Sequence, residues 1–403
     1  MIRKLFFNAR IFTPTSQGSV AVYKKGYILA ENGRISSVGD MDNRQRLLLD
    51  DLHEIDLGGA TVMPGFVDPH THSCFGTTRE SEFNMRLEGK EYLDILKAGG
   101  GILSSARSVE SLSEDDLFTI SSIRVNQMLV NGTTTLEIKS GYGLCTEIEL
   151  KMLRVIERIG REMPIDVVPT FMGAHAVPFE YRNNSDGYVS VVINEMIKAA
   201  KAQGIAKFFD VFCEDGVFSI DQSRKMLNAA ASAGFKLKIH ADEINSLGGA
   251  SLAAEVGAVS AEHLIAASDE GINAMARAGT IAVLLPAAAL SLRKPFARAR
   301  KMIDSGVTVA LATDCNPGSC FCQSMSFVFM LGILEMNMTS EEALKACTLN
   351  AARAIGKERD VGSIEPGKKA DFIVLDCDSP AGIAYRLSSN VVVSVYKMGE
   401  AVA

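Results

Sequence analysis

From Thr61 onward, short apolar runs alternate with longer amphipathic segments. Eight runs rich in Val and Ile are present: TVMPGFVD (from Thr61), TTTLEIK (Thr133), IDVVPTF (Ile165), KFFDVFC (Lys207), KLKIHAD (Lys236), AVSAEHL (Ala258), TIAVLLP (Thr280) and VTVALATD (Val307). This pattern is typical of a parallel sheet whose strands are joined by helices. Eight such units within about 250 residues predict a closed (β/α)8 barrel of the TIM type, because closure pairs the two edge strands.

The two ends of the chain differ from this middle region. They contain alternating apolar and polar runs, such as DFIVLDCDS, which predict strands with one solvent-facing side. Asn32 and Gly33 stand at a hairpin-turn position. A late helix is predicted to begin at the capping box Thr339-Ser340-Glu341-Glu342 and to end near Gly356. We predict a composite β-sandwich domain of residues 1–58 and 357–403, and a barrel domain of residues 59–356.

Composition limits the kinds of partner. The net charge is −7 and no long basic run occurs, which argues against nucleic acid or an anionic membrane. No apolar stretch approaches the roughly 18 residues of a membrane helix. Eight cysteines without a CxxC pair or a secretion signal predict reduced thiols and a cytoplasmic location. A thiolate metal site at Cys315, Cys320 and Cys322 is disfavoured, because a second pair is missing.

Histidine and aspartate residues follow the predicted strands at their carboxyl ends, which form the active-site face of such a barrel. They are His70 and His72 after the first run, His175 after the third, and His240, His263 and Asp314 after the fifth, sixth and eighth. Taken singly, each histidine is more simply a half-buried polar residue. Together, His70, His72, His240 and Asp314 form a nitrogen and oxygen set that suits one Zn²⁺ or iron ion.

Such an ion lowers the pKa of a bound water from about 16 toward about 7. Asp314 is a candidate both to contact the metal and to accept the proton of that water. Glu243, in the stretch HADE, is a candidate to carry a proton to a leaving nitrogen, or alternatively to cap the next helix. His263 is expected to orient the water or to stabilise an oxyanion. Glu214 is a possible bridge to a second metal, but we favour a single ion.

With these residues identified, the chain resembles the amidohydrolase superfamily and, within it, the imidazolonepropionase family. The resemblance spans nearly the whole chain and rests on PGFVDPHTH, RESEFNMRLEG, AGGGI, TTLEIKSGYGL, FMGAHAVP, DVFCEDGVFS, KIHADEINSLGGA, AEHL, ALATDCNPGSC and VGSIEPGKKADFIVLD. It implies zinc or iron held by His70, His72, His240 and Asp314. It also implies a substrate pocket that includes Arg79, Tyr142, His175, Glu243, Asn316, Gly318 and Ser319.

The reaction implied by the resemblance is the hydrolysis of 4-imidazolone-5-propanoate to N-formimidoyl-L-glutamate in histidine degradation. Arg79 supplies a cation for the propanoate carboxylate. Its alternative role is a surface salt bridge with Glu80 or Glu82. The backbone N–H groups of the NPGS turn are a further candidate anion site. A homodimer is expected from the superfamily.

Two other functions stay open at this point. The segments PAAALSL and FGTTRESE depart from the family pattern, which leaves room for another cyclic amide as substrate. A heterocycle deaminase of the cytosine or guanine deaminase type needs the same metal ligands and the same HADE glutamate. A binding protein that has lost catalysis is disfavoured, because all four expected ligands are present.

Overall fold

The computed structural model describes residues 3–42, 52–90 and 100–403, and a barrel of eight parallel strands forms its centre. Ala98 and Gly99 of the AGGGI motif lie outside these residues. The strands follow chain order around the barrel: β6 (Phe66–Asp68), β7 (Thr133–Lys139), β8 (Asp166–Ala174), β9 (Phe208–Cys213), β10 (Lys236–Ala241), β11 (Ser260–His263), β12 (Ile281–Leu284) and β13 (Val309–Leu311). A single parallel bridge between Thr71 and Cys315 joins the first strand to the last. The predicted barrel and the order of its strands are confirmed.

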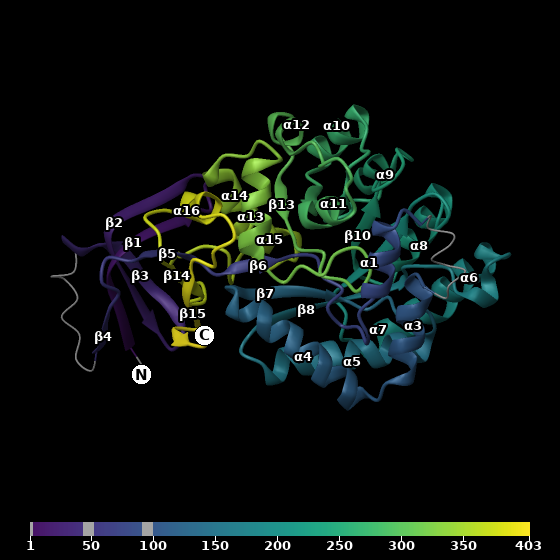
Figure 1. Cartoon of the computed structure of the whole chain (residues 1–403), viewed down its shortest axis with the longest axis horizontal. Helices are drawn as coiled ribbons and strands as arrows, with labels where there is room; N and C mark the ends of the chain where they lie inside the picture. The colour runs from purple at the N-terminus through teal and green to yellow at the C-terminus, as the bar shows by residue number, and fades with distance from the viewer. Residues whose placement is uncertain (1–2, 43–51, 91–99) are drawn as a thin grey trace.

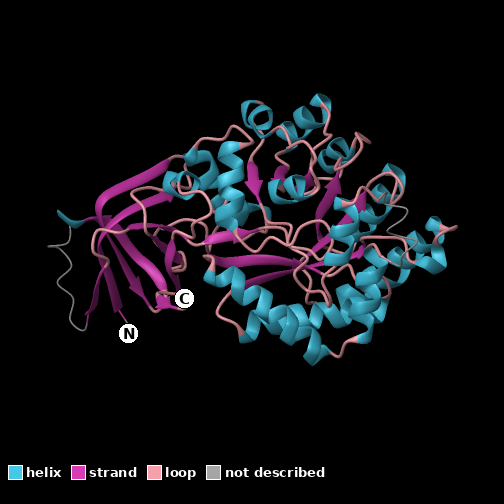
Figure 2. Ribbon diagram, viewed as in Figure 1, coloured by secondary structure: helices cyan, strands magenta, loops and turns pink. Residues whose placement is uncertain are grey.

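Helices surround the barrel and cover the outer faces of its strands (Figure 1, Figure 2). Helix α5 (Thr146–Glu162) shows why: Leu153, Ile156 and Ile159 recur at helical spacing and are fully buried against the strands. The other helices are α1 (Glu80–Leu87), α3 (Ile102–Ser111), α4 (Glu114–Val130), α6 (Ser185–Val191), α7 (Ile197–Gln203), α8 (Ile220–Ser232), α9 (Gly249–Glu255), α10 (Asp269–Ala278), α11 (Pro286–Ser291), α12 (Ala299–Asp304), α13 (Met325–Leu334), α14 (Ser340–Ala346), α15 (Leu349–Ala354) and α16 (Ala381–Tyr385). A 3₁₀ turn (Phe179–Tyr181) and a π-helical turn (Val192–Met196) flank α6.

The two chain ends build a second, mixed sheet beside the barrel, at the left of Figure 1. Its strands are β1 (Arg3–Pro14), β2 (Val20–Glu31), β3 (Arg34–Asp40), β4 (Leu52–Asp56), β5 (Thr61–Pro64), β14 (Phe372–Leu375), β15 (Val392–Lys397) and β16 (Glu400–Ala401). Their order is β16-β15-β14-β5-β1-β2-β3, with β4 also beside β1. Asn32 and Gly33 have positive φ and form the predicted turn between β2 and β3. The predicted small β unit is thus one connected sheet.

Two predicted elements are divided in the structure. The run from Thr61 is two strands, because β5 pairs with β1 and β14 whereas β6 enters the barrel. Gly65 separates them, and a side chain there would lie 2.3 Å from the Thr134 hydroxyl. The late helix begins at the predicted capping box of Thr339, but it ends at Ala346 and resumes as α15. The carbonyl of Cys347, between the two helices, accepts the backbone N–H of Val67 in the barrel.

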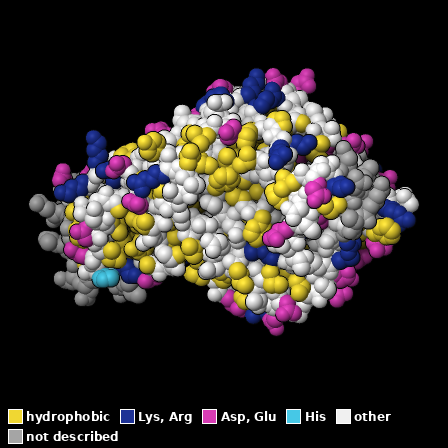
Figure 3. Space-filling model, in the orientation of Figure 1, with side chains coloured by type: hydrophobic (Ala, Val, Ile, Leu, Met, Phe, Trp, Pro, Cys, Tyr) yellow, Lys and Arg dark blue, Asp and Glu magenta, His cyan; other side chains and the backbone are white. Residues whose placement is uncertain are grey.

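Charged surface groups of both signs are interspersed on the face shown in Figure 3, with apolar side chains between them. Among the helices of the described residues, none combines the length and the apolar character needed to cross a bilayer.

An ion cluster ties the terminal sheet to the start of barrel strand β8. Asp166 lies 2.7 Å from the ammonium groups of both Lys369 and Lys397, and Lys397 also pairs with Asp371. Burial alone raises the pKa of Asp166, but the two lysines outweigh it and hold that pKa below its ordinary value of 3.8. A carboxyl with a lowered folded-state pKa stabilises the fold above its unfolded pKa, and this stabilisation is lost as the pH falls through the folded pKa.

We therefore expect Asp166→Asn to destabilise the protein by about 1–2 kcal/mol at neutral pH. As the pH falls through the folded-state pKa, which lies below 3.8, the wild-type carboxyl is also protonated, so the difference should shrink. Scanning calorimetry from pH 7 to pH 3 measures both effects. The exposed Asp304, which pairs with Arg300, is the matched control, and its Asn variant should change stability by less than about 0.5 kcal/mol. Equal melting temperatures for Asp166→Asn and wild type at pH 7 would contradict the expectation.

Candidate functional site

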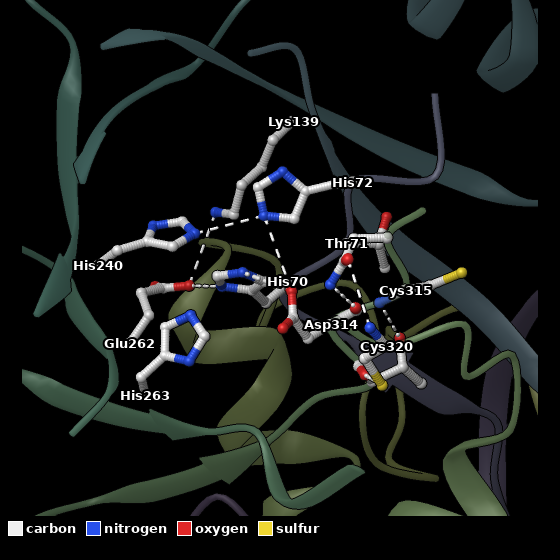
Figure 4. Close-up of polar contacts among 12 residues, drawn as sticks. His70, Thr71, His72, Lys139, His240, Glu262, His263, Asp314, Cys315 and Cys320 are labelled. Carbon is white, nitrogen blue, oxygen red and sulfur yellow. Dashed lines mark hydrogen bonds and ion pairs between the residues drawn. The ribbon is translucent and has the colours of Figure 1, made fainter. Parts of the chain in front are cut away.

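Three imidazoles and a carboxylate converge at the C-terminal mouth of the barrel (Figure 4). The ligand nitrogens of His70, His72 and His240 all lie within 4.8 Å of one another. Asp314 Oδ1 is 3.5 Å from His70 Nε2 and 3.8 Å from His72 Nε2. All four side chains are buried. The structure thus brings together the four residues that the sequence predicted as metal ligands, from the segment after β6, from β10 and from the segment after β13.

The electrostatics of this cluster suit a divalent cation. Burial lowers the pKa of His70, His72 and His240 well below the ordinary value, so their imidazoles are neutral at physiological pH. The Nε2 atom of His70 is buried and has no hydrogen-bond partner among the described residues. Burial also raises the pKa of Asp314 to about 7, which a nearby cation would reverse. Neutral imidazoles with unshared lone pairs are what Zn²⁺ or Fe²⁺ requires.

Two buried carboxylates that we did not predict orient the histidines. Glu262 hydrogen-bonds to His70 Nδ1, and Asp210 lies 3.1 Å from His240 Nδ1. Each contact turns the Nε2 atom of its ring toward the centre of the cluster. Carboxylate partners of this kind commonly set the tautomer and orientation of metal-binding histidines.

Beneath them, Lys139 is completely buried inside the barrel. Its ammonium lies 2.7 Å from Asp210, 2.8 Å from Glu137 and 3.6 Å from Glu262. Lys238 is a second buried cation, 3.2 Å from Glu262. Burial alone lowers the pKa of Lys139, but Asp210 and Glu137 outweigh it and raise that pKa above its ordinary value. The available sequence signal was the charged positions inside the apolar runs TTTLEIK, KFFDVFC and KLKIHAD.

His263 and Glu243 lie on one side of the cluster. The ring of His263 is 5.3 Å from that of His240, and its Nε2 atom is 3.6 Å from Glu243 Oε2. Glu243 does not cap the next helix, because Asp242 accepts the backbone N–H groups at the start of α9 instead. The Glu243 carboxylate therefore faces His263 and the histidine cluster rather than the helix.

Glu214 is not placed as a metal bridge. Its carboxylate accepts the backbone N–H groups of Ile244 and Asn245 and so holds the loop that follows Glu243. The possible bridging role considered from the sequence is not supported by this geometry.

Tyr142 and His175 line the same side of the mouth as His72. The His175 ring stacks on His72 with a centroid separation of 4.8 Å and an interplanar angle of 20°, and its Nδ1 atom is 3.0 Å from the Gly141 carbonyl. Burial lowers the pKa of His175 to about 4, so this imidazole is neutral. The Tyr142 ring is 5.3 Å from His175. The SGYGL and GAHAVP motifs therefore meet beside the metal cluster.

The polar groups of the NPGS turn hydrogen-bond within the turn and to the segment before it. Asn316 Oδ1 accepts the N–H groups of Gly318 and Ser319 at 2.9 and 2.8 Å, and its amide donates to the Asp314 carbonyl at 2.8 Å. The expectation that these two N–H groups face a substrate anion is therefore wrong. The turn instead fixes the wall of the pocket relative to Asp314.

Arg79 lies in a pocket of about 210 Å³ beside this turn, together with Phe83, Arg86, Ser319 and Phe321. Its guanidinium makes two contacts with Glu82, at 2.9 and 2.8 Å. The predicted alternative pairing with Glu82 is thus present. Both side chains are largely buried, so it is not a surface salt bridge.

Comparisons with known proteins agree with this geometry. The model of the amidohydrolase family matches residues 61–402. An imidazolonepropionase from Syntrophobacter fumaroxidans is 54% identical, covering 98% of this chain and 96% of that protein. One from Desulfotalea psychrophila is 51% identical and covers 100% of both. Among solved structures, guanine deaminase from E. coli has a TM-score of 0.76 at 15% identity, covering 100% of this chain and 99% of that one, a likeness of fold alone.

The buried network predicts that Lys139→Met weakens metal binding and the fold together, because it leaves three carboxylates without their shared cation. We expect a loss of about 3–5 kcal/mol of stability. The affinity for Zn²⁺, measured by competition with a chromophoric chelator, should fall about 10- to 100-fold. Thermal unfolding of metal-free protein reports the first effect separately.

Lys151→Met is the matched control for this prediction. Lys151 is also a buried lysine, but its ammonium donates to the carbonyls of Val109 and Leu112 rather than to carboxylates of the site. The control should lose stability and keep wild-type affinity for Zn²⁺. If Lys139→Met also kept that affinity, the network would have no role in holding the histidines.

Proposed function

The chain belongs to the amidohydrolase family, and we propose that it hydrolyses 4-imidazolone-5-propanoate to N-formimidoyl-L-glutamate. The observation that carries this proposal is the convergence of the His70, His72, His240 and Asp314 side chains beside a pocket that contains arginine. Two relatives named imidazolonepropionase, more than half identical over nearly the whole chain, support the choice of substrate.

We further propose that one zinc or iron ion per chain is held by these four residues. Their neutral imidazoles and the unpartnered Nε2 atom of His70 support this assignment. When bound, such an ion supplies a Lewis acid and lowers the pKa of water.

The residues at and beside the predicted metal site carry out the proton transfers and stabilise charge during hydrolysis. The water oxygen bonds to the ring carbonyl carbon, the adjacent carbon–nitrogen bond breaks, and the leaving nitrogen gains a proton. Asp314 takes a proton from the attacking water, and Glu243 accepts this proton and passes it to the ring nitrogen, so that both carboxylates end in the state in which they began. His263, 3.6 Å from Glu243, stabilises the oxyanion that forms on the carbonyl.

Other residues at the mouth of the barrel orient the substrate. Arg79 binds the propanoate carboxylate, and the rings of Tyr142 and His175 pack against the heterocycle. Asn316, Gly318 and Ser319 form the wall that positions it, because their turn is anchored to the Asp314 carbonyl. The pocket also contains Ser291 of the PAAALSL segment, so that segment contributes to the shape of the site.

We also propose that the protein works in the cytoplasm as a homodimer of two-domain chains. The boundary near residue 357 is kept, whereas the boundary expected near residue 58 is moved to Pro64, because β5 pairs with β1 and β14 of the terminal sheet. All eight cysteines are free thiols, which suits a reducing compartment. Light scattering of the purified protein tests the dimer.

The direct test is the ultraviolet decay of freshly prepared 4-imidazolone-5-propanoate with metal-loaded protein, corrected for spontaneous breakdown. We expect rapid loss of substrate with formimidoylglutamate as product. His240→Ala should abolish the reaction and the stoichiometric metal content, whereas His53→Ala, a histidine outside the barrel, should retain both. Substrate loss no faster than background in the wild type would refute the proposal. Ammonia release from a nucleobase would then favour a heterocycle deaminase.

Proton transfer is tested separately by Glu243→Gln, which keeps the size of the side chain and removes its proton acceptor. We expect kcat to fall by about 10²- to 10⁴-fold while the bound metal is retained. Asp215→Asn, in the neighbouring loop after β9, is the control and should leave kcat within about twofold of wild type, since changes away from the site have small effects. A pH profile of Glu243→Gln identical to that of the wild type would exclude the role.

A further inference from the structure

We propose that Arg86 is a second carboxylate-binding cation of the substrate pocket. This inference rests on the proposed function, since it assigns the part of the site that holds the propanoate group. Arg86 belongs to the last turn of α1 and lines the same pocket as Arg79.

The charge of Arg79 is already balanced. Its guanidinium contacts both oxygens of Glu82, and the two side chains are only 13% and 7% exposed. Glu82 also accepts the backbone N–H of Gly101, which holds the carboxylate in place. A substrate carboxylate that approaches Arg79 alone would therefore also meet the negative charge of Glu82. The pocket needs a further cation to attract an anion.

Arg86 is that cation. It stands seven residues after Arg79, about two helical turns, and so emerges on the same side of the segment. Its guanidinium donates to the Gly318 carbonyl at 3.0 Å, and no carboxylate of the described residues pairs with it. Burial and the nearby Arg79 lower the pKa of Arg86, and the opposing influence of Glu82 is the smaller one, as expected for a half-buried cation without a carboxylate in direct contact.

Gly318 connects this arginine to the reacting centre. Its carbonyl accepts from Arg86, and a side chain at Gly318 would lie 2.6 Å from Arg79 Nη1, so both guanidinium groups pack on one short turn. Asn316 anchors that turn to the Asp314 carbonyl. The separation between the two cations and the metal cluster is thus set by a single hydrogen-bonded loop. A substrate with a heterocycle at one end and a carboxylate at the other matches this arrangement.

The first experiment is steady-state hydrolysis of 4-imidazolone-5-propanoate by metal-loaded wild type and Arg86→Gln. Loss of a charged hydrogen bond to the carboxylate should raise KM by about tenfold or more and leave kcat within about twofold. Arg86→Lys should recover part of the loss, because it restores the charge without the planar fork. Arg182→Gln is the control, since Arg182 is an exposed arginine that packs on Phe179 at a different depression of the surface.

The second experiment measures binding without turnover. Imidazole-4-propanoate and its methyl ester are titrated calorimetrically into each metal-loaded protein. Wild type and Arg182→Gln should prefer the acid, and Arg86→Gln should lose most of this preference. Circular dichroism of the four proteins verifies that all of them fold.

The outcomes separate this inference from the proposed function. If wild type hydrolyses the substrate and Arg86→Gln keeps both the wild-type KM and the preference for the acid, Arg86 has no role in carboxylate binding. If wild type does not hydrolyse the substrate but the preference for the acid depends on Arg86, the anion site stands and the proposed reaction fails. A fall in kcat without a change in KM or in the preference would also overturn the inference.

Discussion

The rest of the structure depends on a buried ion network inside the barrel. Lys139 holds Asp210 and Glu137 at hydrogen-bond distance and lies near Glu262, with all four groups removed from water. Burying an ion costs several kcal/mol, so each member is tolerated only while its partners are in place. Because Asp210 and Glu262 in turn hold His240 and His70, the same contacts that stabilise the barrel interior also orient the metal-binding rings.

Above this network, the strand ends turn sharply toward the mouth of the barrel. Asp242, His263 and Asp314 all have positive φ, a conformation that costs non-glycine residues energy and is maintained only where contacts enforce it. The contacts are visible for two of them: Asp242 caps α9 with four backbone hydrogen bonds, and the Asp314 carbonyl is held by Asn316. Hydrogen bonds therefore hold these two strand ends in their positive-φ conformation.

The fold alone does not select the substrate. Guanine deaminase from E. coli and a 5-methylcytosine deaminase from Klebsiella pneumoniae share the architecture at 15% identity, with TM-scores of 0.76 and 0.75. The substrate must instead be selected by the side chains beside the metal cluster. The pocket contains Arg79, which is paired with Glu82, and Arg86, which donates to a backbone carbonyl, and a cation without a carboxylate partner favours an acidic substrate over a neutral base.

The sequence by itself determined the eight βα units, the His70–His72 pair and the strand ends that carry His240, His263 and Asp314, because these follow from local periodicity and from strand geometry. Only the tertiary structure decided which buried charges meet. The His70 contact with Glu262 joins residues 192 positions apart, and the Cys347 carbonyl at the helix break accepts the backbone N–H of Val67. Local pattern does not encode such pairings, since each partner is placed by the closure of the barrel as a whole.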